Sequence, residues 1–136
     1  MISERREKTM ANEAVSTENA PAALGPYSQA IKAGGFVFTA GMVPIDPKTG
    51  KMPDSIEDQT KQVIENVTAV LKASGAEPKD IVRTTVYLTD IGTFDVVNGI
   101  YSMIVDKPYP SRVCIQVSKI PKGAKIMVDA VAYCGN

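Results

Sequence analysis

The chain has 136 residues, and its 15 basic and 15 acidic side chains cancel to a formal net charge of zero. This length corresponds to one domain with one core, and the balanced charge gives no general attraction to nucleic acid or to an anionic membrane surface. The absence of histidine excludes a Ser-His-Asp triad, a Cys-His pair and a zinc site with imidazole ligands.

The first fifteen residues are mostly polar and include several glutamates, which is typical neither of a secretory signal nor of a mitochondrial transit peptide. We expect a flexible tail over residues 1–15, a single domain over residues 16–136 and a cytoplasmic location. No apolar run approaches the roughly 20 residues of a membrane-spanning helix. Cys114 and Cys134 match no metal-ligand spacing, so we expect no metal, no disulfide and a reducing compartment.

The first half of the domain predicts a hairpin followed by a helix. Residues 27–33 and 36–40 are short strand candidates on either side of Gly34 and Gly35, a dipeptide that favours a tight reversal. Ser55, with Asp58 three residues later, predicts the start of a helix, and Gly75 predicts its end. Between them, apolar residues recur with helical spacing: Val63, Ile64, Val67, Val70 and Leu71.

The second half predicts a further strand, a helix and two more strands. Residues 81–89 are rich in β-branched side chains, and we expect this strand to pair in parallel with the first hairpin through a right-handed crossover. A helix should follow over residues 93–105, capped by Thr93 and ended by Pro108 and Pro110. Its inward stripe is expected to be Phe94, Val97, Tyr101 and Ile104.

After Pro110, an arginine stands inside an alternating apolar pattern. Arg112 and Cys114 alternate with valine and isoleucine, which is typical of a strand with chemically different faces. Residues 120–123 predict a turn, and alternation resumes over residues 125–132. In the antiparallel hairpin that we expect, Asp129 lies opposite Cys114, as a diagonal neighbour of Arg112 at roughly 7 Å on the same surface.

Arg112 is the strongest candidate for function in the sequence. Its guanidinium stays charged and offers a planar fork that matches a carboxylate, so it suits an anionic substrate. The alternative is a structural salt bridge with Asp129 or another acid. The other side chains expected on this face carry no charge: Cys114, Gln116, Met127 and Val131.

The element order ββαβαββ predicts an α+β fold in which two helices cover one face of a sheet. The other face has no cover and carries valine, isoleucine, methionine and tyrosine. We therefore expect a closed homo-oligomer with clefts between its subunits.

Four segments carry a resemblance to a known family: ENAPAALGPYSQAI at residues 18–31, TAGMVPIDPKTG at 39–50, DQTKQVIENV at 58–67 and PSRVCIQVSKIPKGAKIMVDAVA at 110–132. The chain resembles the RidA (YjgF) family of enamine and imine deaminases. The resemblance implies a chorismate-mutase-like fold and a homotrimer with three cofactor-free sites at subunit junctions. It also implies hydrolysis of 2-aminoacrylate and 2-aminocrotonate, through their imines, to 2-oxo acids and ammonia, which disarms by-products of pyridoxal-phosphate dehydratases.

The resemblance also assigns roles to individual residues. Arg112 would hold the substrate carboxylate together with the backbone amide of Cys114, whose thiol equally suits a small buried hydrophobe. Asp129 and Tyr27 would direct the attacking water, although a tyrosine at a strand start is often half-buried core. Three further residues would line the substrate: Ala40, Gly41 and Asn98. For Gly41 a simple bulge, and for Asn98 a local cap, remain alternatives.

Two departures from the family pattern bear on activity. Ala40 and Met42 stand where many relatives have serine and glutamine. Asp129 replaces a glutamate and is shorter by one carbon, roughly 1.5 Å, which could slow turnover, move the water or change the substrate. A regulatory binder of 2-oxo acids or amino acids is therefore an alternative. A ribonuclease or translation inhibitor is less favoured, because histidine, excess positive charge and abundant aromatic residues are all lacking.

Overall fold

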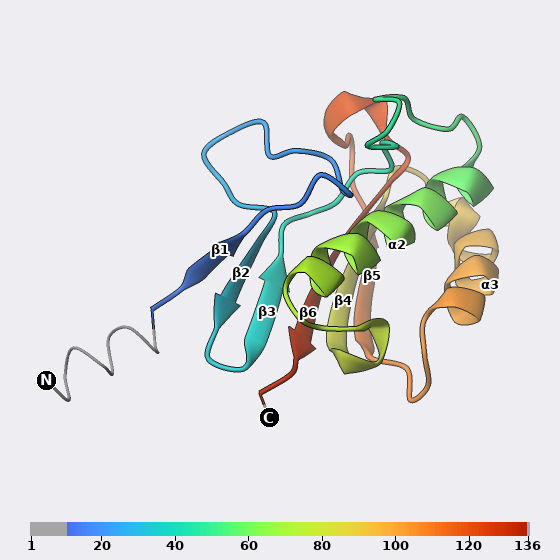
Figure 1. Ribbon diagram of the computed structural model, residues 1–136. Coiled ribbons are helices and arrows are strands. Elements are labelled where there is room, and N and C mark those ends of the chain that lie inside the picture. The colour runs from blue at the N-terminus through green and yellow to red at the C-terminus, as the bar shows by residue number, and fades with distance from the viewer. Residues whose placement is uncertain (1–10, 136) are drawn as a thin grey trace, which may run out of the picture.

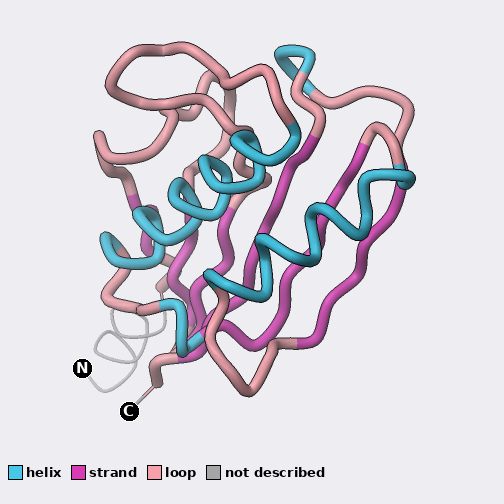
Figure 2. The backbone as a smooth tube through the Cα atoms, turned by 90° about the vertical axis from the view of Figure 1, so that its right-hand side faces the viewer, coloured by secondary structure: helices cyan, strands magenta, loops and turns pink. Residues whose placement is uncertain are grey.

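A six-stranded sheet carries two helices on one face in the computed structural model, which describes residues 11–135 (Figures 1 and 2). The strands lie in the order β1-β2-β3-β6-β4-β5. Their bounds are Glu13–Val15, Ala30–Ala33, Phe36–Thr39, Ile126–Tyr133, Ile81–Leu88 and Ser111–Gln116 in that order, and the helices are α2, Ile56–Ala73, and α3, Phe94–Ile104. The α+β class and the placement of both helices on one face are confirmed.

The first hairpin is confirmed, but the domain begins earlier than predicted. β2 and β3 pair antiparallel around Gly34, whose φ of 61° suits glycine, and β2 begins at Ala30 rather than at residue 27. β1 adds to the sheet by pairing Glu13 with Lys32. The tail boundary at residue 15 is therefore wrong, because a polar segment can join a sheet through its backbone alone. Residues 1–10 of the predicted tail lie outside the described residues.

Helix α2 begins and ends where the sequence predicts. The Ser55 hydroxyl accepts a hydrogen bond from the backbone N–H of Asp58 at 3.1 Å, which satisfies one of the free donors of the first turn. Gly75 follows the last turn with a φ of 87°. All five predicted core residues of this helix are buried.

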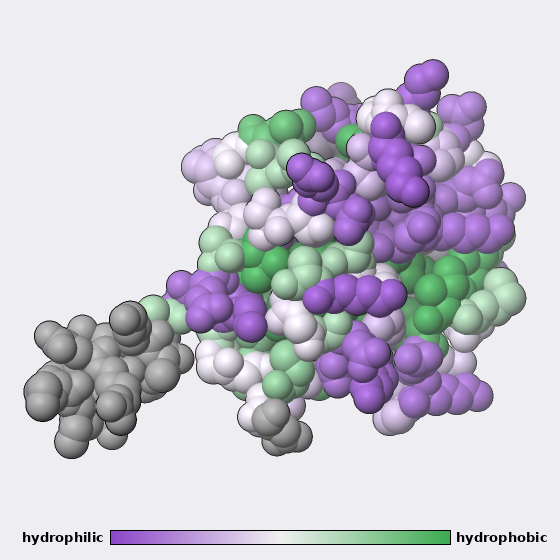
Figure 3. Space-filling view, viewed as in Figure 1, coloured by the Kyte–Doolittle hydropathy of each residue, from purple (hydrophilic) through white to green (hydrophobic). Residues whose placement is uncertain are grey.

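Helix α3 forms where the sequence predicts, flanked by Thr93 and Val105, but its first turn and its inward stripe differ from the prediction. A 3-10 turn over Ile91–Thr93 leads straight into the helix, and the Thr93 hydroxyl donates to the carbonyl of Asp90 instead of capping. Val97 and Tyr101 are buried as predicted, but Ile104 is exposed and Phe94 only half-buried. Figure 3 shows apolar surface on the side of α3, whereas hydrophilic side chains predominate along α2.

For the second half of the domain, the predicted strand pairing is wrong. β6 lies between β3 and β4, so β4 pairs with β6 and β5 and not with the first hairpin. β4 runs antiparallel to β6 and parallel to β5, so β5 and β6 form no hairpin. Residues 117–125 are long enough to pass over the end of β4, where Val117 N–H donates to the Leu88 carbonyl and Thr89 N–H to the Lys125 carbonyl. A period of two identifies a strand but does not identify its neighbour.

The two faces of the sheet differ sharply in composition. Under the helices lie buried side chains such as Val86, Val128 and Ala130. The opposite face, hereafter the open face, is covered by no helix within residues 11–135. It carries the exposed Arg83, which pairs with Val131, and several exposed apolar side chains that include Phe38 and Ile115. Phe36 stacks on Tyr133 there, with ring centroids 4.8 Å apart.

Candidate functional site

Arg112 lies on the helix-bearing face of the sheet, at its edge strand β5. It pairs in register with Thr84, which is buried beneath the helices, and residues paired across strands share a face. Its guanidinium carbon lies 4.9 Å from the ring centroid of Tyr101 and 5.4 Å from that of Phe94. Arg112 is thus held by ring faces of α3.

No acidic side chain neutralises Arg112 in the described part of the chain. The one ion pair found over residues 11–135 joins Lys79 to Glu77 at 3.5 Å, and no side-chain hydrogen bond found there uses the Arg112 guanidinium. The structural salt bridge considered from the sequence is therefore wrong within this subunit. Ring faces attract the cation but leave its N–H donors free for a planar anion.

A cavity of about 400 Å³ opens beside Arg112 and is hereafter the anchor cavity. Asn98 lines it, together with Tyr101, Ser102, Tyr109 and Pro110. Behind the cavity, the hydroxyls of Tyr101 and Thr84 form a buried hydrogen bond of 2.8 Å, which fixes the ring under the guanidinium. Asn98 and Arg112 thus line one cavity, whose size suits a small carboxylate.

Cys114 lies two residues along β5 and faces the same side as Arg112. Burial raises the pKa of its thiol, and the positive charge of Arg112 opposes that rise only in part. The protonated thiol is therefore favoured at neutral pH, which fits a small hydrophobe better than a nucleophile.

Asp129 lies on the open face, away from Arg112. It pairs in register with Thr85, and Thr84 next to it pairs with both Ala130 and Arg112. Because successive residues of a strand point to opposite faces, Asp129 and Arg112 lie on opposite sides of the sheet. The prediction that they share one surface is wrong, and its cause is the strand β4 that separates β5 from β6.

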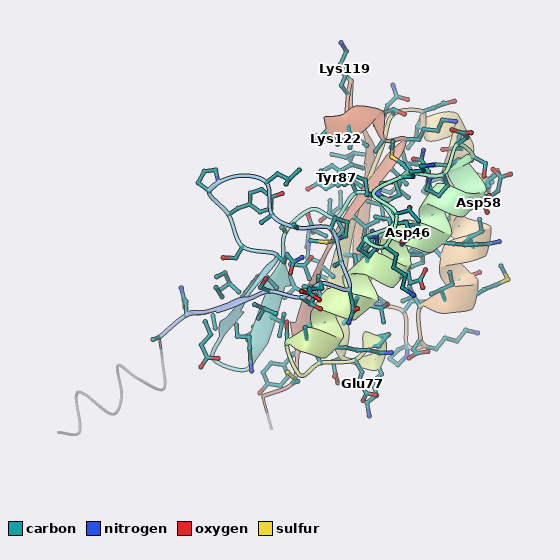
Figure 4. The ribbon with its side chains drawn as sticks, turned by 45° about the horizontal axis from the view of Figure 1, so that its top comes forward. Asp46, Asp58, Glu77, Tyr87, Lys119 and Lys122 are labelled. Carbon is teal, nitrogen blue, oxygen red and sulfur yellow. The ribbon has the colours of Figure 1, made fainter. Side chains whose placement is uncertain are left out.

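Asp129 accepts a hydrogen bond from Tyr87, a residue that the sequence did not single out. Tyr87 donates its hydroxyl to Asp129 Oδ2 at 3.1 Å, and Figure 4 labels Tyr87 at the end of the sheet near the turn that carries Lys122. Burial raises the pKa of Tyr87, as do the charge of Asp129 and its hydrogen bond, while Thr85 acts weakly in the opposite direction. Alternation along β4 puts Tyr87 and Thr85 on one face, but only the pairing with β6 makes Asp129 their neighbour.

Ala40 and Gly41 reach the neighbourhood of Asp129 through a bulge. The β3–β6 ladder stops at Phe38 opposite Val131 and resumes at Met42 opposite Val128, so residues 39–41 face residues 129 and 130. A Cβ on Gly41 would lie 2.8 Å from the Met127 sulfur. Gly41 is thus both a bulge residue and a point of close approach.

Tyr27 is an exposed loop residue and not half-buried core, since 53% of it is accessible. Its hydroxyl accepts a hydrogen bond from the backbone N–H of Leu24 at 3.4 Å. It lines a cavity of about 740 Å³, formed largely by residues 14–29, in which Lys122 is also found. No hydrogen bond found over residues 11–135 joins Tyr27 to Asp129.

Residues 11–135 offer neither a cluster of metal ligands nor a helix suited to a membrane. No group of three or more histidine, cysteine, aspartate and glutamate residues there could hold a metal ion. None of the helices in that span is long and apolar enough to cross a membrane.

Comparison with known proteins identifies relatives over almost the whole chain. The family model described as Endoribonuclease L-PSP matches residues 17–134. A RutC family protein of Pyrococcus horikoshii is 48% identical over 122 residues, covering 89% of this chain and 97% of its own. The 2-iminobutanoate/2-iminopropanoate deaminase of Salmonella typhimurium is 41% identical over 121 residues, covering 87% and 94%.

Solved structures of related proteins are similar to this chain in fold as well as in sequence. The crystal structure of Escherichia coli TdcF with bound serine superposes with a TM-score of 0.86 at 38% identity, covering 89% of this chain and 98% of that one. RidA from an Antarctic Psychrobacter gives a TM-score of 0.87 at 36% identity, with 89% and 98% covered.

Proposed function

The chain belongs to the endoribonuclease L-PSP family, which includes the RidA deaminases, and we propose that it hydrolyses reactive 2-enamine and 2-imino acids to 2-oxo acids and ammonia. The observation that carries the proposal is Arg112. A guanidinium without an acidic partner among the described residues, held on aromatic faces beside a cavity, suits a small carboxylate. The relatives named as deaminases supply the reaction class.

The reaction needs little beyond positioning. The substrate carboxylate pairs with the Arg112 fork, aided by the backbone N–H of Cys114 and by Asn98. Water attacks the imine carbon, the C=N electron pair moves to nitrogen, and nitrogen takes a proton. The nitrogen of the resulting carbinolamine then takes a second proton, its hydroxyl loses one, and the C–N bond breaks, which releases ammonia and leaves the ketone. No cofactor is required, because such imines already hydrolyse in water and each tenfold acceleration needs only about 1.4 kcal/mol.

Asp129 is the proposed acceptor of the proton from the attacking water, with Tyr27 as a second water-directing group. Because Asp129 and Arg112 lie on opposite faces of one sheet, they serve one substrate only when they come from different subunits. We propose a homotrimer in which the open face of one subunit packs beside β5 of the next. The apolar open face and the position of β5 at the edge of the sheet support this arrangement.

A non-catalytic binder of 2-oxo acids or amino acids is the second candidate. Asp129 has the shorter acidic side chain, and one of its oxygens is already bonded to Tyr87. The related E. coli TdcF was crystallised with serine, which is a ligand of this kind. A protein with this function would bind its ligand in the anchor cavity without hydrolysing any substrate.

One assay separates the two candidates. A threonine dehydratase generates 2-aminocrotonate, whose ultraviolet absorbance decays as it hydrolyses, with and without the protein. We expect faster decay with the protein, in keeping with a cytoplasmic role beside pyridoxal-phosphate dehydratases. Unchanged decay, together with calorimetric binding of 2-oxobutanoate, would instead favour the binder.

A further inference from the structure

Lys122 has a backbone conformation that lysine rarely adopts. It lies in the 3-10 turn Pro121–Gly123, within the connection between β5 and β6. Its φ is 65°, and it is the one residue other than glycine with a positive φ in the described part of the chain. Such a conformation is costly for a residue with a Cβ and persists only where the surrounding structure enforces it. The loop, and not the preference of lysine, therefore determines where this side chain starts.

The loop is anchored on both sides of Lys122. Ile120 precedes the turn and Ala124 follows it, and both side chains are buried. The backbone N–H of Lys125 donates to Gln59 Oε1 of helix α2 at 2.8 Å. Because the loop is bound to the core and to α2, it presents Lys122 from a rigid turn.

The ammonium group of Lys122 has no protein partner among residues 11–135, since neither an ion pair nor a side-chain hydrogen bond is found for it. In the same loop, Lys125 donates its ammonium to the Asp54 carbonyl at 2.7 Å. Lys119 extends away from the molecule beyond the turn (Figure 4). An exposed lysine is ordinary by itself, and what distinguishes Lys122 from Lys119 is the cavity that it lines.

That cavity, hereafter the Tyr27 cavity, has a volume of about 740 Å³. Binding sites of roughly 300–1,000 Å³ hold drug-sized ligands, whereas the side chain of 2-aminocrotonate ends in one methyl group. Apolar side chains such as Leu24 and Ile45 contribute to the wall, and among the described residues Lys122 is the one basic and Glu18 the one acidic side chain that lines it. The cavity therefore suits a longer side chain with a charged end.

The wall opposite Lys122 is formed before any ligand binds. Gln29 is buried, and its side chain accepts a hydrogen bond from the backbone N–H of Thr17 at 2.6 Å. Its amide also donates to the carbonyls of Thr17 and Pro21, at 3.1 and 2.7 Å. A ligand that enters between two rigid walls orders little of the protein, which favours its binding.

We propose that the Tyr27 cavity takes the side chain of the substrate and that Lys122 binds a distal carboxylate, so that imino dicarboxylic acids are substrates of this protein. The inference rests on the proposed function, in which Tyr27 lies beside the imine carbon. The first carboxylate binds Arg112 of the neighbouring subunit, and the methylene groups between the two carboxylates pack on the apolar wall. A distal carboxylate is favoured over a distal amine because Lys122, unlike Glu18, is held in an enforced conformation.

The test compares two oxo acids by calorimetry, as stand-ins for imino acids that hydrolyse in water. The first, 2-oxoglutarate, has a distal carboxylate, and the second, 2-oxohexanoate, has an apolar end. We expect wild type to bind 2-oxoglutarate about three- to fivefold more tightly, the effect of a partly exposed ion pair. Lys122→Gln should abolish this preference by weakening 2-oxoglutarate alone, and Lys122→Arg should keep it.

Lys119→Gln is the matched control, because it removes a lysine of the same loop that does not line the Tyr27 cavity. Both affinities should stay within about twofold of those of wild type. Thermal melting of each variant shows whether it is folded. Equal weakening of both oxo acids in folded Lys122→Gln would indicate a general attraction for anions, and equal affinities in wild type would exclude a distal site. Either result would overturn the proposal.

Hydrolysis of 2-aminocrotonate by wild type, in the dehydratase-coupled assay, tests the proposed function separately. If wild type accelerates that hydrolysis but binds both oxo acids equally, only the distal site is wrong. If wild type prefers 2-oxoglutarate through Lys122 but does not accelerate hydrolysis, the deaminase function fails and the distal site belongs to a binding protein.

Discussion

Arg112 is held by side chains of its own subunit, whereas Asp129 lies on a face that no helix within residues 11–135 covers. The guanidinium rests on Tyr101 and Phe94 beside a formed cavity, and the Tyr101 ring is fixed by Thr84. Asp129 has one hydroxyl partner and shares its face with exposed apolar side chains and with Arg83 of the neighbouring strand. The Arg112 region is formed within one subunit, whereas the Asp129 region needs a second subunit to form a site in the proposed trimer.

This difference suggests a division between binding and chemistry. The anchor cavity can hold a carboxylate whether or not the water-directing groups are intact. The Asp129 region contributes to rate only when it meets a bound substrate. Substitutions in the two regions should therefore affect different kinetic constants, and three of them test this division from the largest expected effect to the smallest.

Asp129→Asn should have the largest effect. It keeps the size and hydrogen-bonding shape of the side chain but removes the acceptor of the water proton, a role worth roughly 10² to 10⁴-fold in rate. We expect kcat to fall about a thousandfold while the Kd for 2-oxobutanoate, measured by calorimetry, stays within about threefold. A comparable loss of binding would mean that the two regions are not separable.

Arg112→Ala should produce the complementary result. Losing a charge-assisted, bidentate contact of about 1.5–3 kcal/mol should weaken 2-oxobutanoate binding roughly 10- to 100-fold. Arg112→Lys is the matched control, since it keeps the charge without the planar fork and should recover only part of the affinity. Near-normal binding and turnover in a well-folded Arg112→Ala protein would show that Arg112 does not bind the substrate carboxylate.

Phe94→Leu should have the smallest effect. It removes one of the two rings beneath the guanidinium, a contact worth about 0.5–1 kcal/mol at a partly exposed site, so KM should rise roughly two- to fivefold at unchanged kcat. The same change in an Arg112→Ala background should have no further effect on KM. An equal effect in both backgrounds would show that Phe94 acts on stability and not through Arg112.

Local features of the fold could be predicted from the sequence, because local chemistry determines them. Ser55 caps α2 and Gly75 follows its end, and the hairpin at Gly34 forms as its dipeptide indicates. Strand neighbours could not be predicted in the same way. Residues 125–132 have the period of a strand whether they return beside β5 or cross to β3, and the long connection allowed the crossing.

The site could be predicted only in part for the same reason. Arg112 and Asn98 meet because α3 packs over the edge of the sheet to which Arg112 belongs. The prediction that Arg112 and Asp129 share one surface depended on a hairpin between β5 and β6, and it is wrong because these strands are not neighbours. Tyr87 carried no signal of its own, since a tyrosine in a strand is ordinary, and its partner was identified only by the register of β4 with β6.

Mixed assembly of two inactive variants tests the central claim, that Arg112 and Asp129 of different subunits form one site. Arg112→Ala and Asp129→Ala chains with different tags are co-expressed, and trimers that carry both tags are isolated and assayed beside each variant alone. In every trimer that carries both tags, one of the three junctions regains both residues, so the isolated trimers should restore about a third of the wild-type rate. If both residues of a site came from the same subunit, every site would lack one of them, so mixed trimers as inactive as the single variants would contradict the account.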